Sequence, residues 1–216
     1  MWLTSSLTKM YILFTIITSL VCYLILKWMK KRRYCTDLKR LDGNTVLITG
    51  GNAGIGKETA VALAMRGARV IIACRDVDKA EKAVREIKIR GHNVNVHHME
   101  LDLANMCSIR DFCKTFLQRE KRLDILINNA GYVQSSWTYH YSILFRMLMQ
   151  VIMFMFFVPC EMGAQTVVYC AVSDEAAKHS GGYFTDCRPA TLRSFARDAG
   201  VAKKLWEASE RLVNLA

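Results

Sequence analysis

The stretch "GNTVLITGGNAGIGKETAVALAMRGARVIIACRD", residues 43–76, constrains the fold more than any other part of the chain. A short apolar, β-rich run at 45–49 precedes a glycine-rich turn. A helical pattern at 57–66 and a second buried strand at 69–74 follow it. Parallel strands need a crossover helix between them, so this order predicts a βαβ unit, the building block of a doubly wound α/β sheet.

The glycines of the turn indicate a phosphate-binding site. Gly50, Gly54 and Gly56 let the backbone approach a pyrophosphate closely, and the new helix directs its free N–H groups and positive dipole end toward it. The spacing is G-x-x-x-G-x-G, which differs from the general G-x-G-x-x-G fingerprint. Taken alone, the turn is equally compatible with an ordinary connection between a strand and a helix.

The same alternation of strands and helices continues to residue 129. A charged amphipathic helix at 78–90 is followed by a strand at 94–98, a helix at 105–120 and a strand at 123–129. His97 and His98 end the third strand without a third ligand at metal-site spacing, so we interpret them as structural. The C-terminal helix, 201–213, is amphipathic, and we expect its apolar face to pack against the core.

The N-terminal segment predicts a membrane anchor. Residues 10–26 are 17 residues without a charge, between Lys9 and Lys27. As a helix they measure about 25 Å, slightly less than a ~30 Å hydrocarbon core, and the flanking lysines extend that reach by snorkelling. A cleaved signal peptide is the alternative, but no small-x-small cleavage site follows. We expect an uncleaved transmembrane helix with a basic flank, and the rest of the chain in the cytosol.

Charge and cysteine usage narrow the function class. The net charge is +11, and the first 43 residues hold +6 of it, with eight Lys or Arg against two Asp. That distribution indicates a membrane flank, so we expect no nucleic-acid partner. The eight cysteines include no C-x-x-C pair and no zinc-ligand spacing, which predicts free thiols in a reducing compartment and no metal site.

Three short motifs resemble those of the short-chain dehydrogenases/reductases. "TGGNAGIG" at 49–56, "LDL" at 101–103 and "NNAG" at 128–131 stand in the family's order. "ACRD" at 73–76, with "GAQTVVYCA", "GGYFTDC" and "KKLWEASERLV" later in the chain, looks like the retinol dehydrogenase group. The resemblance implies NADP(H), a lipophilic alcohol or aldehyde substrate, and an endoplasmic reticulum membrane with the main domain facing the cytosol. It leaves open a homo- or heterodimer.

The motifs define a predicted cofactor site. Arg75 follows the second strand directly, where an NAD enzyme carries an acid for the ribose 2′-hydroxyl, and its guanidinium suits a 2′-phosphate. Lys57 is a candidate second cation. The resemblance assigns Asp102 to the adenine and Asn129 to bracing the central strand. The complete set is Gly50, Asn52, Gly54, Ile55, Gly56, Lys57, Arg75, Asp102, Leu103, Asn129, Ala130 and Gly131.

The family's catalytic residues have no counterpart after these motifs. By resemblance, a Tyr and a Lys four residues later share one helix face, where the Lys lowers the pKa of the proton-transferring Tyr, and a Ser on the preceding strand orients the carbonyl. Only Tyr23 and Lys27 show this spacing, and they precede the nucleotide motifs. We therefore assign no catalytic residue.

From about residue 133 the chain resembles a later stretch of the family, as if an internal block were missing. The predicted fold is a Rossmann-like doubly wound parallel sheet, truncated by loss of strands 5 and 6, with an N-terminal transmembrane helix. The expected divisions are an anchor (1–40), an NADP-binding part (41–132) and a C-terminal remnant (133–216). Residues 147–158 are apolar but too short to span, which favours an interfacial helix or lid, or a core helix.

The sequence is compatible with three hypotheses about function. The first is an NADP(H)-linked oxidoreductase of retinol-type alcohols and aldehydes with impaired catalysis. The second is a non-enzymatic, membrane-tethered NADP(H)-binding or dimerising pseudoenzyme. The third is a splice or gene-model product that folds poorly, because the strand at 123–129 would become an exposed sheet edge.

Overall fold

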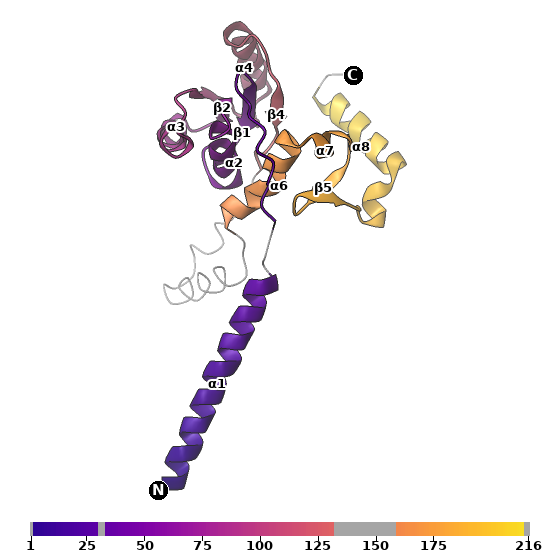
Figure 1. Cartoon of the computed structure of the whole chain (residues 1–216). Helices are drawn as coiled ribbons and strands as arrows, with labels where there is room; N and C mark the ends of the chain where they lie inside the picture. The colour runs from indigo at the N-terminus through magenta and orange to yellow at the C-terminus, as the bar shows by residue number, and fades with distance from the viewer. Residues whose placement is uncertain (1, 30–32, 132–158, 214–216) are drawn as a thin grey trace.

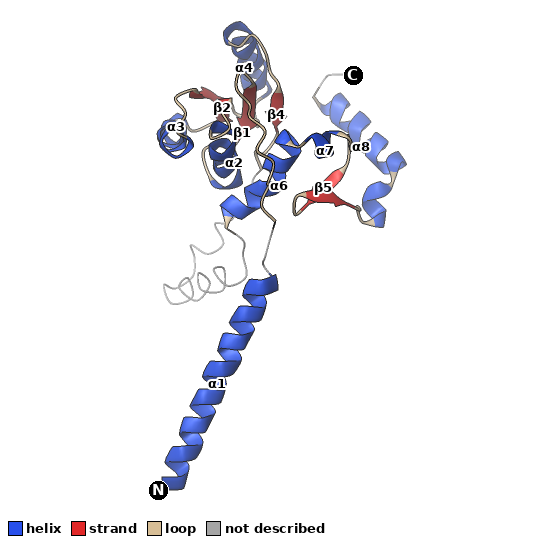
Figure 2. Ribbon diagram, viewed as in Figure 1, coloured by secondary structure: helices blue, strands red, loops and turns tan. Residues whose placement is uncertain are grey.

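A four-stranded parallel sheet forms the centre of the molecule (Figure 2). The computed structural model describes residues 2–29, 33–131 and 159–213. The strands stand in the order β3-β2-β1-β4, and Val46 of β1 pairs with Val70 of β2 and Ile125 of β4. This arrangement confirms the predicted Rossmann-like parallel sheet. The strands are β1 (Thr45–Thr49), β2 (Arg69–Cys74), β3 (Val96–Glu100) and β4 (Ile125–Ile127).

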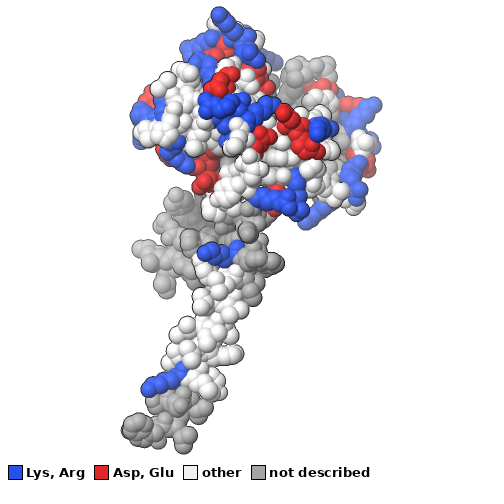
Figure 3. Space-filling view, viewed as in Figure 1, with Lys and Arg blue, Asp and Glu red and all other residues white. Residues whose placement is uncertain are grey.

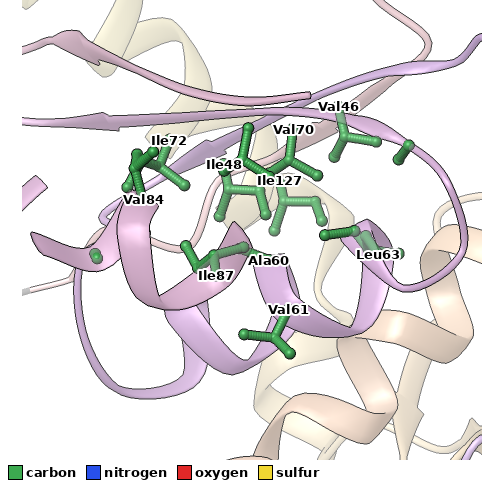
Figure 4. Packing of buried hydrophobic residues seen from close by; sticks show 14 of the residues in the cluster. Val46, Ile48, Ala60, Val61, Leu63, Val70, Ile72, Val84, Ile87 and Ile127 are labelled. Carbon is green, nitrogen blue, oxygen red and sulfur yellow. The ribbon is translucent and has the colours of Figure 1, made fainter. Parts of the chain in front are cut away.

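Helices cover both faces of this sheet. The bounds are α2 (Gly54–Ala64), α3 (Val77–Gly91), α4 (Met106–Arg119) and α6 (Cys160–Val172). Successive strand residues point to opposite faces. Ile48 and Ile72 therefore pack with Leu63 of α2 and Ile87 of α3 (Figure 4). Val168 of α6 belongs to the same buried cluster. Leu47 and Ile71 pack on the other face, with Phe112 and Phe116 of α4.

The N-terminal helix α1 (Trp2–Met29) extends away from the α/β part (Figure 1), and its described surface is almost free of charge (Figure 3). In the part of the chain that the structure describes, no helix is long and apolar enough to cross a membrane. The prediction that residues 10–26 form a transmembrane helix was therefore wrong, and so was the part of the predicted fold class that included it. The uncharged run has only 17 residues, and its length of about 25 Å falls short of the ~30 Å hydrocarbon core.

The C-terminal part contributes a small hairpin and three short or exposed helices. "GGYFTDC" contains one arm of an antiparallel hairpin whose turn residues Asp186 and Cys187 have φ of 53° and 55°. Tyr169 of α6 contacts Phe184 across 6.0 Å between ring centroids. The elements are α7 (Asp174–Ala177), β5 (Tyr183–Thr185), β6 (Arg188–Ala190), η2 (Ser194–Arg197) and α8 (Ala199–Leu212).

The apolar face of α8 does not pack as expected. No residue of α8 is buried, and Leu205, Trp206 and Leu212 are 68%, 67% and 84% exposed. The packing prediction was wrong, because helical periodicity identifies an apolar face but not the surface that would cover it. The apolar segment at 147–158 lies outside the described residues.

The strand β4 forms one edge of the sheet. Within the described residues it pairs with β1 alone, and its ladder covers only three of the seven residues predicted at 123–129. Leu126, in the middle of β4, is 52% exposed. An apolar edge strand with unpaired backbone groups is a template for pairing with another chain.

We predict that Leu126→Lys slows aggregation of the purified chain, because a lysine on an edge strand opposes pairing with a second edge. The free energy of unfolding should change by less than about 0.5 kcal/mol, as for other exposed positions. Light scattering at rising protein concentration measures the effect. Leu117→Lys, at a 77% exposed position on α4, is the control and should not slow aggregation. Equal behaviour of the two variants would contradict the edge-pairing explanation.

Candidate functional site

A cavity of about 570 Å³ opens at the carboxyl ends of the parallel strands. In open α/β sheets this is the end at which ligands bind. Strand ends and the segments after them supply its wall. The lining residues are Gly50, Asn52, Ala73, Cys74, Arg75, Asp76, Lys79, Leu101, Asp102, Leu103, Ala104, Ala130 and Gly131.

The cavity brings together seven of the twelve predicted cofactor residues. These are Gly50, Asn52, Arg75, Asp102, Leu103, Ala130 and Gly131. Five predicted residues lie outside its lining: Gly54, Ile55, Gly56, Lys57 and Asn129. Sequence reasoning missed Ala73, Cys74, Asp76, Lys79, Leu101 and Ala104. Cys74, Asp76 and Leu101 directly flank the predicted Arg75 or Asp102, and Ala104 follows the predicted Leu103; that adjacency was the signal that could have found these four.

The glycine turn has the backbone conformation that a glycine requires. Gly50 and Gly54 adopt φ of 67° and 58°, in the left-handed region. A Cβ on Gly56 would lie 2.4 Å from Asn129 Nδ2 and 2.6 Å from the Gly50 carbonyl oxygen. Ala53, the N-cap of α2, provides no side-chain acceptor for the first N–H groups of the helix. Those donors suit an anion, so the turn fits a pyrophosphate.

Asn129 and Thr49 join the ends of β4 and β1. The Asn129 side-chain amide donates to the carbonyl oxygens of Thr49 (3.0 Å) and Gly50 (3.2 Å). The Thr49 hydroxyl accepts the backbone N–H groups of Asn129 (3.1 Å) and Ala130 (3.0 Å). These bonds position Ala130 and Gly131 on the cavity wall.

Lys57 is engaged in an ion pair away from this wall. Its Nζ donates to both carboxylate oxygens of Glu86 on α3, at 2.8 and 3.0 Å. The hydrogen bond from Lys57 is the main reason why the pKa of Glu86 is lowered. The ion pair links α2 to α3, and Glu86 neutralises the charge of Lys57.

The end of β2 supplies the charged residues of the cavity. Arg75 is exposed, and within the described residues it forms no salt bridge. Asp76, the N-cap of α3, accepts the Lys79 backbone N–H at 3.0 Å through Oδ1 and pairs with Lys79 Nζ at 2.8 Å through Oδ2. The hydrogen bond between the side chains lowers the pKa of Asp76 and raises that of Lys79.

Asp102 shapes the opposite part of the wall. Its Oδ1 accepts the Ala104 backbone N–H at 3.0 Å, and its own N–H donates to Ser108 Oγ at 3.0 Å. These bonds fix the turn between β3 and α4, which also carries Leu103.

His97 lies outside the cavity lining. Its Nε2 is 3.0 Å from Arg69 Nη1, and Arg69 forms a two-point ion pair with Glu120 at 2.8 Å for each contact. Burial and the Arg69 charge lower the pKa of His97. The contacts fit the structural interpretation of this histidine.

Comparison with known proteins finds similarity to the short-chain dehydrogenases. The family model for short chain dehydrogenases matches residues 44–179. Mouse "Retinol dehydrogenase 11" is 57% identical over 97 residues, covering 45% of this chain and 31% of the relative. Mouse "Retinol dehydrogenase 12" is 47% identical over 127 residues, covering 56% and 40%. A short-chain type dehydrogenase/reductase structure from Mycobacterium ulcerans shows 30% identity with a TM-score of 0.41, covering 44% of this chain and 35% of that one. The chain thus spans about a third of the length of these curated relatives.

We predict that Gly56→Ala destabilises the chain by about 1–3 kcal/mol, because the new methyl group overlaps the Asn129 amide and the Gly50 carbonyl. Chemical denaturation measures the free energy of unfolding. Gly131→Ala is the matched control, since among the described residues the atom nearest to its new Cβ would lie at 3.9 Å, an ordinary contact. An unchanged free energy of unfolding in Gly56→Ala would contradict the close packing of Gly56 against Asn129 and Gly50.

We predict slow alkylation of Cys74 in the native chain. Burial raises the pKa of this thiol to about 11, and only the thiolate reacts. At pH 8 its reaction with iodoacetamide should be about 100-fold slower than that of the exposed Cys107 and Cys113. Because folding raises this pKa, the associated stability is present below pH 9 and is lost as pH rises toward 11. Peptide mass spectrometry gives the rates, and equal rates at pH 8 would contradict the burial.

Proposed function

We propose that this chain, which belongs to the short-chain dehydrogenase family, binds NADP(H) in the cavity at the carboxyl ends of its strands. The observation that carries the proposal is a cavity lined by Gly50, Asn52 and Arg75, with a glycine turn that leads into α2, whose start has no side-chain cap. The turn suits the pyrophosphate and the guanidinium suits a further phosphate.

The preference for NADP(H) over NAD(H) rests on the charges after β2. An NAD enzyme uses a free carboxylate there to accept the ribose 2′-hydroxyl. In this chain the first residue after β2 is Arg75, and the next carboxylate, Asp76, is paired with Lys79. A guanidinium binds phosphate through two parallel N–H groups, which makes the 2′-phosphate the better ligand.

The proposed reaction class is the interconversion of retinol-type alcohols and aldehydes. It is supported by the names of the relatives, which are retinol dehydrogenases. The dinucleotide supplies hydride transfer when bound, and the residues of this chain hold and orient it. We propose that turnover is impaired, because no Tyr-x-x-x-Lys pair follows the nucleotide motifs in the sequence. Loss of a positioned general acid–base costs roughly 10²- to 10⁴-fold in rate.

A second candidate is a non-enzymatic NADP(H)-binding protein. The observation that favours it is the contrast between two sets of residues. Gly50 and Asn52 of the glycine turn line a cavity with Arg75. The sequence contains the Tyr–Lys spacing only at Tyr23 and Lys27, which precede the nucleotide motifs. Binding measurements test both candidates, and turnover of an added aldehyde separates them.

We predict that NADPH raises the unfolding temperature of the full chain by several degrees more than NADH does. Binding to the native state at 100 times Kd adds about 2.7 kcal/mol. Arg75→Ala should weaken NADPH binding by about tenfold or more and leave NADH binding unchanged, because it removes a charge-assisted bond to phosphate. Arg110→Ala, an exposed arginine on α4 outside the cavity, is the control. NADPH affinity that survives Arg75→Ala would refute the NADP assignment.

A further inference from the structure

The first turn of α3 places an ion pair on the cavity wall beside Arg75. Asp76 and Lys79 both line the cavity, and their side chains are joined at 2.8 Å. Asp76 uses its other oxygen to cap α3, so both of its oxygens are engaged. The sequence motifs did not single out Lys79 as a binding residue.

The charges in the cavity wall are evenly divided. Arg75 and Lys79 are the cations, and Asp76 and Asp102 are the carboxylates. Asp102 directs Oδ1 to the Ala104 N–H on the β3 side of the wall. Of the two carboxylates, Asp76 is the one adjacent in sequence to Arg75. If Asp76 were unpaired, its negative charge would repel a phosphate bound by Arg75.

The pairing with Lys79 changes what Asp76 can do. An ammonium group has three N–H donors, and the pair with Asp76 uses one of them. Lys79 therefore neutralises the carboxylate and keeps donors for an anion in the same cavity. Lys57, the second cation expected from the sequence, has its charge occupied by Glu86 and lies outside the lining.

We propose that the Asp76–Lys79 pair determines whether the cavity prefers a 2′-phosphorylated or an unphosphorylated nucleotide. Lys79 joins Arg75 in binding the 2′-phosphate and prevents Asp76 from accepting a ribose hydroxyl. This inference rests on the proposed NADP(H) function and adds to it a specificity-determining pair. When Lys79 is removed, Asp76 becomes free to favour the unphosphorylated ribose.

The test is calorimetric titration of the full chain with 2′,5′-ADP and with 5′-AMP, two probes that differ only in the 2′-phosphate. Lys79→Ala should weaken 2′,5′-ADP binding about tenfold or more, while 5′-AMP affinity stays equal or rises. Lys79→Arg should retain the preference of the parent chain. Lys114→Ala, at an exposed lysine on α4 outside the lining, is the control and should change either affinity less than twofold.

Asp76→Asn provides an independent variant. Asparagine keeps the oxygen that caps α3, so the helix start is preserved. Because the substitution removes the negative charge and frees Lys79, 2′,5′-ADP should bind more tightly than to the parent chain. The preference for 2′,5′-ADP over 5′-AMP should widen accordingly.

The outcomes separate this inference from the proposed function. A parent chain that binds neither probe, or binds both equally, overturns the NADP(H) proposal and the pair's role with it. A parent chain that prefers 2′,5′-ADP supports the proposed function. If Lys79→Ala then weakens both probes equally or neither, or if Asp76→Asn weakens 2′,5′-ADP, the specificity role of the pair is refuted while NADP(H) binding stands.

Discussion

The site depends on the bonds between Thr49 at the end of β1 and Asn129 after β4. The Thr49 hydroxyl accepts two consecutive backbone N–H groups, and the Asn129 amide donates to two consecutive carbonyl oxygens. Thr49 is only 6% exposed, so breaking the set would leave buried polar groups unpaired, at a cost of about 1–3 kcal/mol for each. These bonds hold the glycine turn against the Ala130–Gly131 segment, and Gly50, Ala130 and Gly131 line the cavity.

The same bonds explain how a short edge strand stays in register. At the start of β4, Asp124 accepts the Thr45 N–H through its side chain at 2.8 Å and donates its own N–H to the Thr45 carbonyl oxygen at 3.0 Å. At the far end, Asn129 binds Thr49. Polar bonds thus secure both ends of a three-residue ladder. Among the described residues β4 has a neighbour on one side only, and these bonds compensate for that. Leu126 lies exposed between the two bonded ends.

The sequence predicted the elements whose signals are local. The observed bounds of β1 and β2 equal the predicted 45–49 and 69–74, because buried parallel strands are uninterrupted apolar runs that end at turn residues. Contacts between distant segments were not predictable. The pairing of Lys57 with Glu86 joins two helices, and the pairing of Lys79 with Asp76 depends on where α3 begins. The packing of α8 was misjudged because an apolar face does not specify which surface covers it. The membrane span at 10–26 was misjudged because the uncharged run is too short.

Nucleotide binding and turnover require different parts of the fold. The glycine turn, the start of α2 and Arg75 all belong to one βαβ unit, and β3 and β4 complete the cavity by residue 131. Proton transfer requires a further Tyr and Lys on one helix face, positioned against the substrate. A chain can therefore retain a complete nucleotide wall without the groups that move the proton. The bonds between Thr49 and Asn129 keep that wall in place, so the proposed affinity for the dinucleotide does not depend on the proposed loss of turnover.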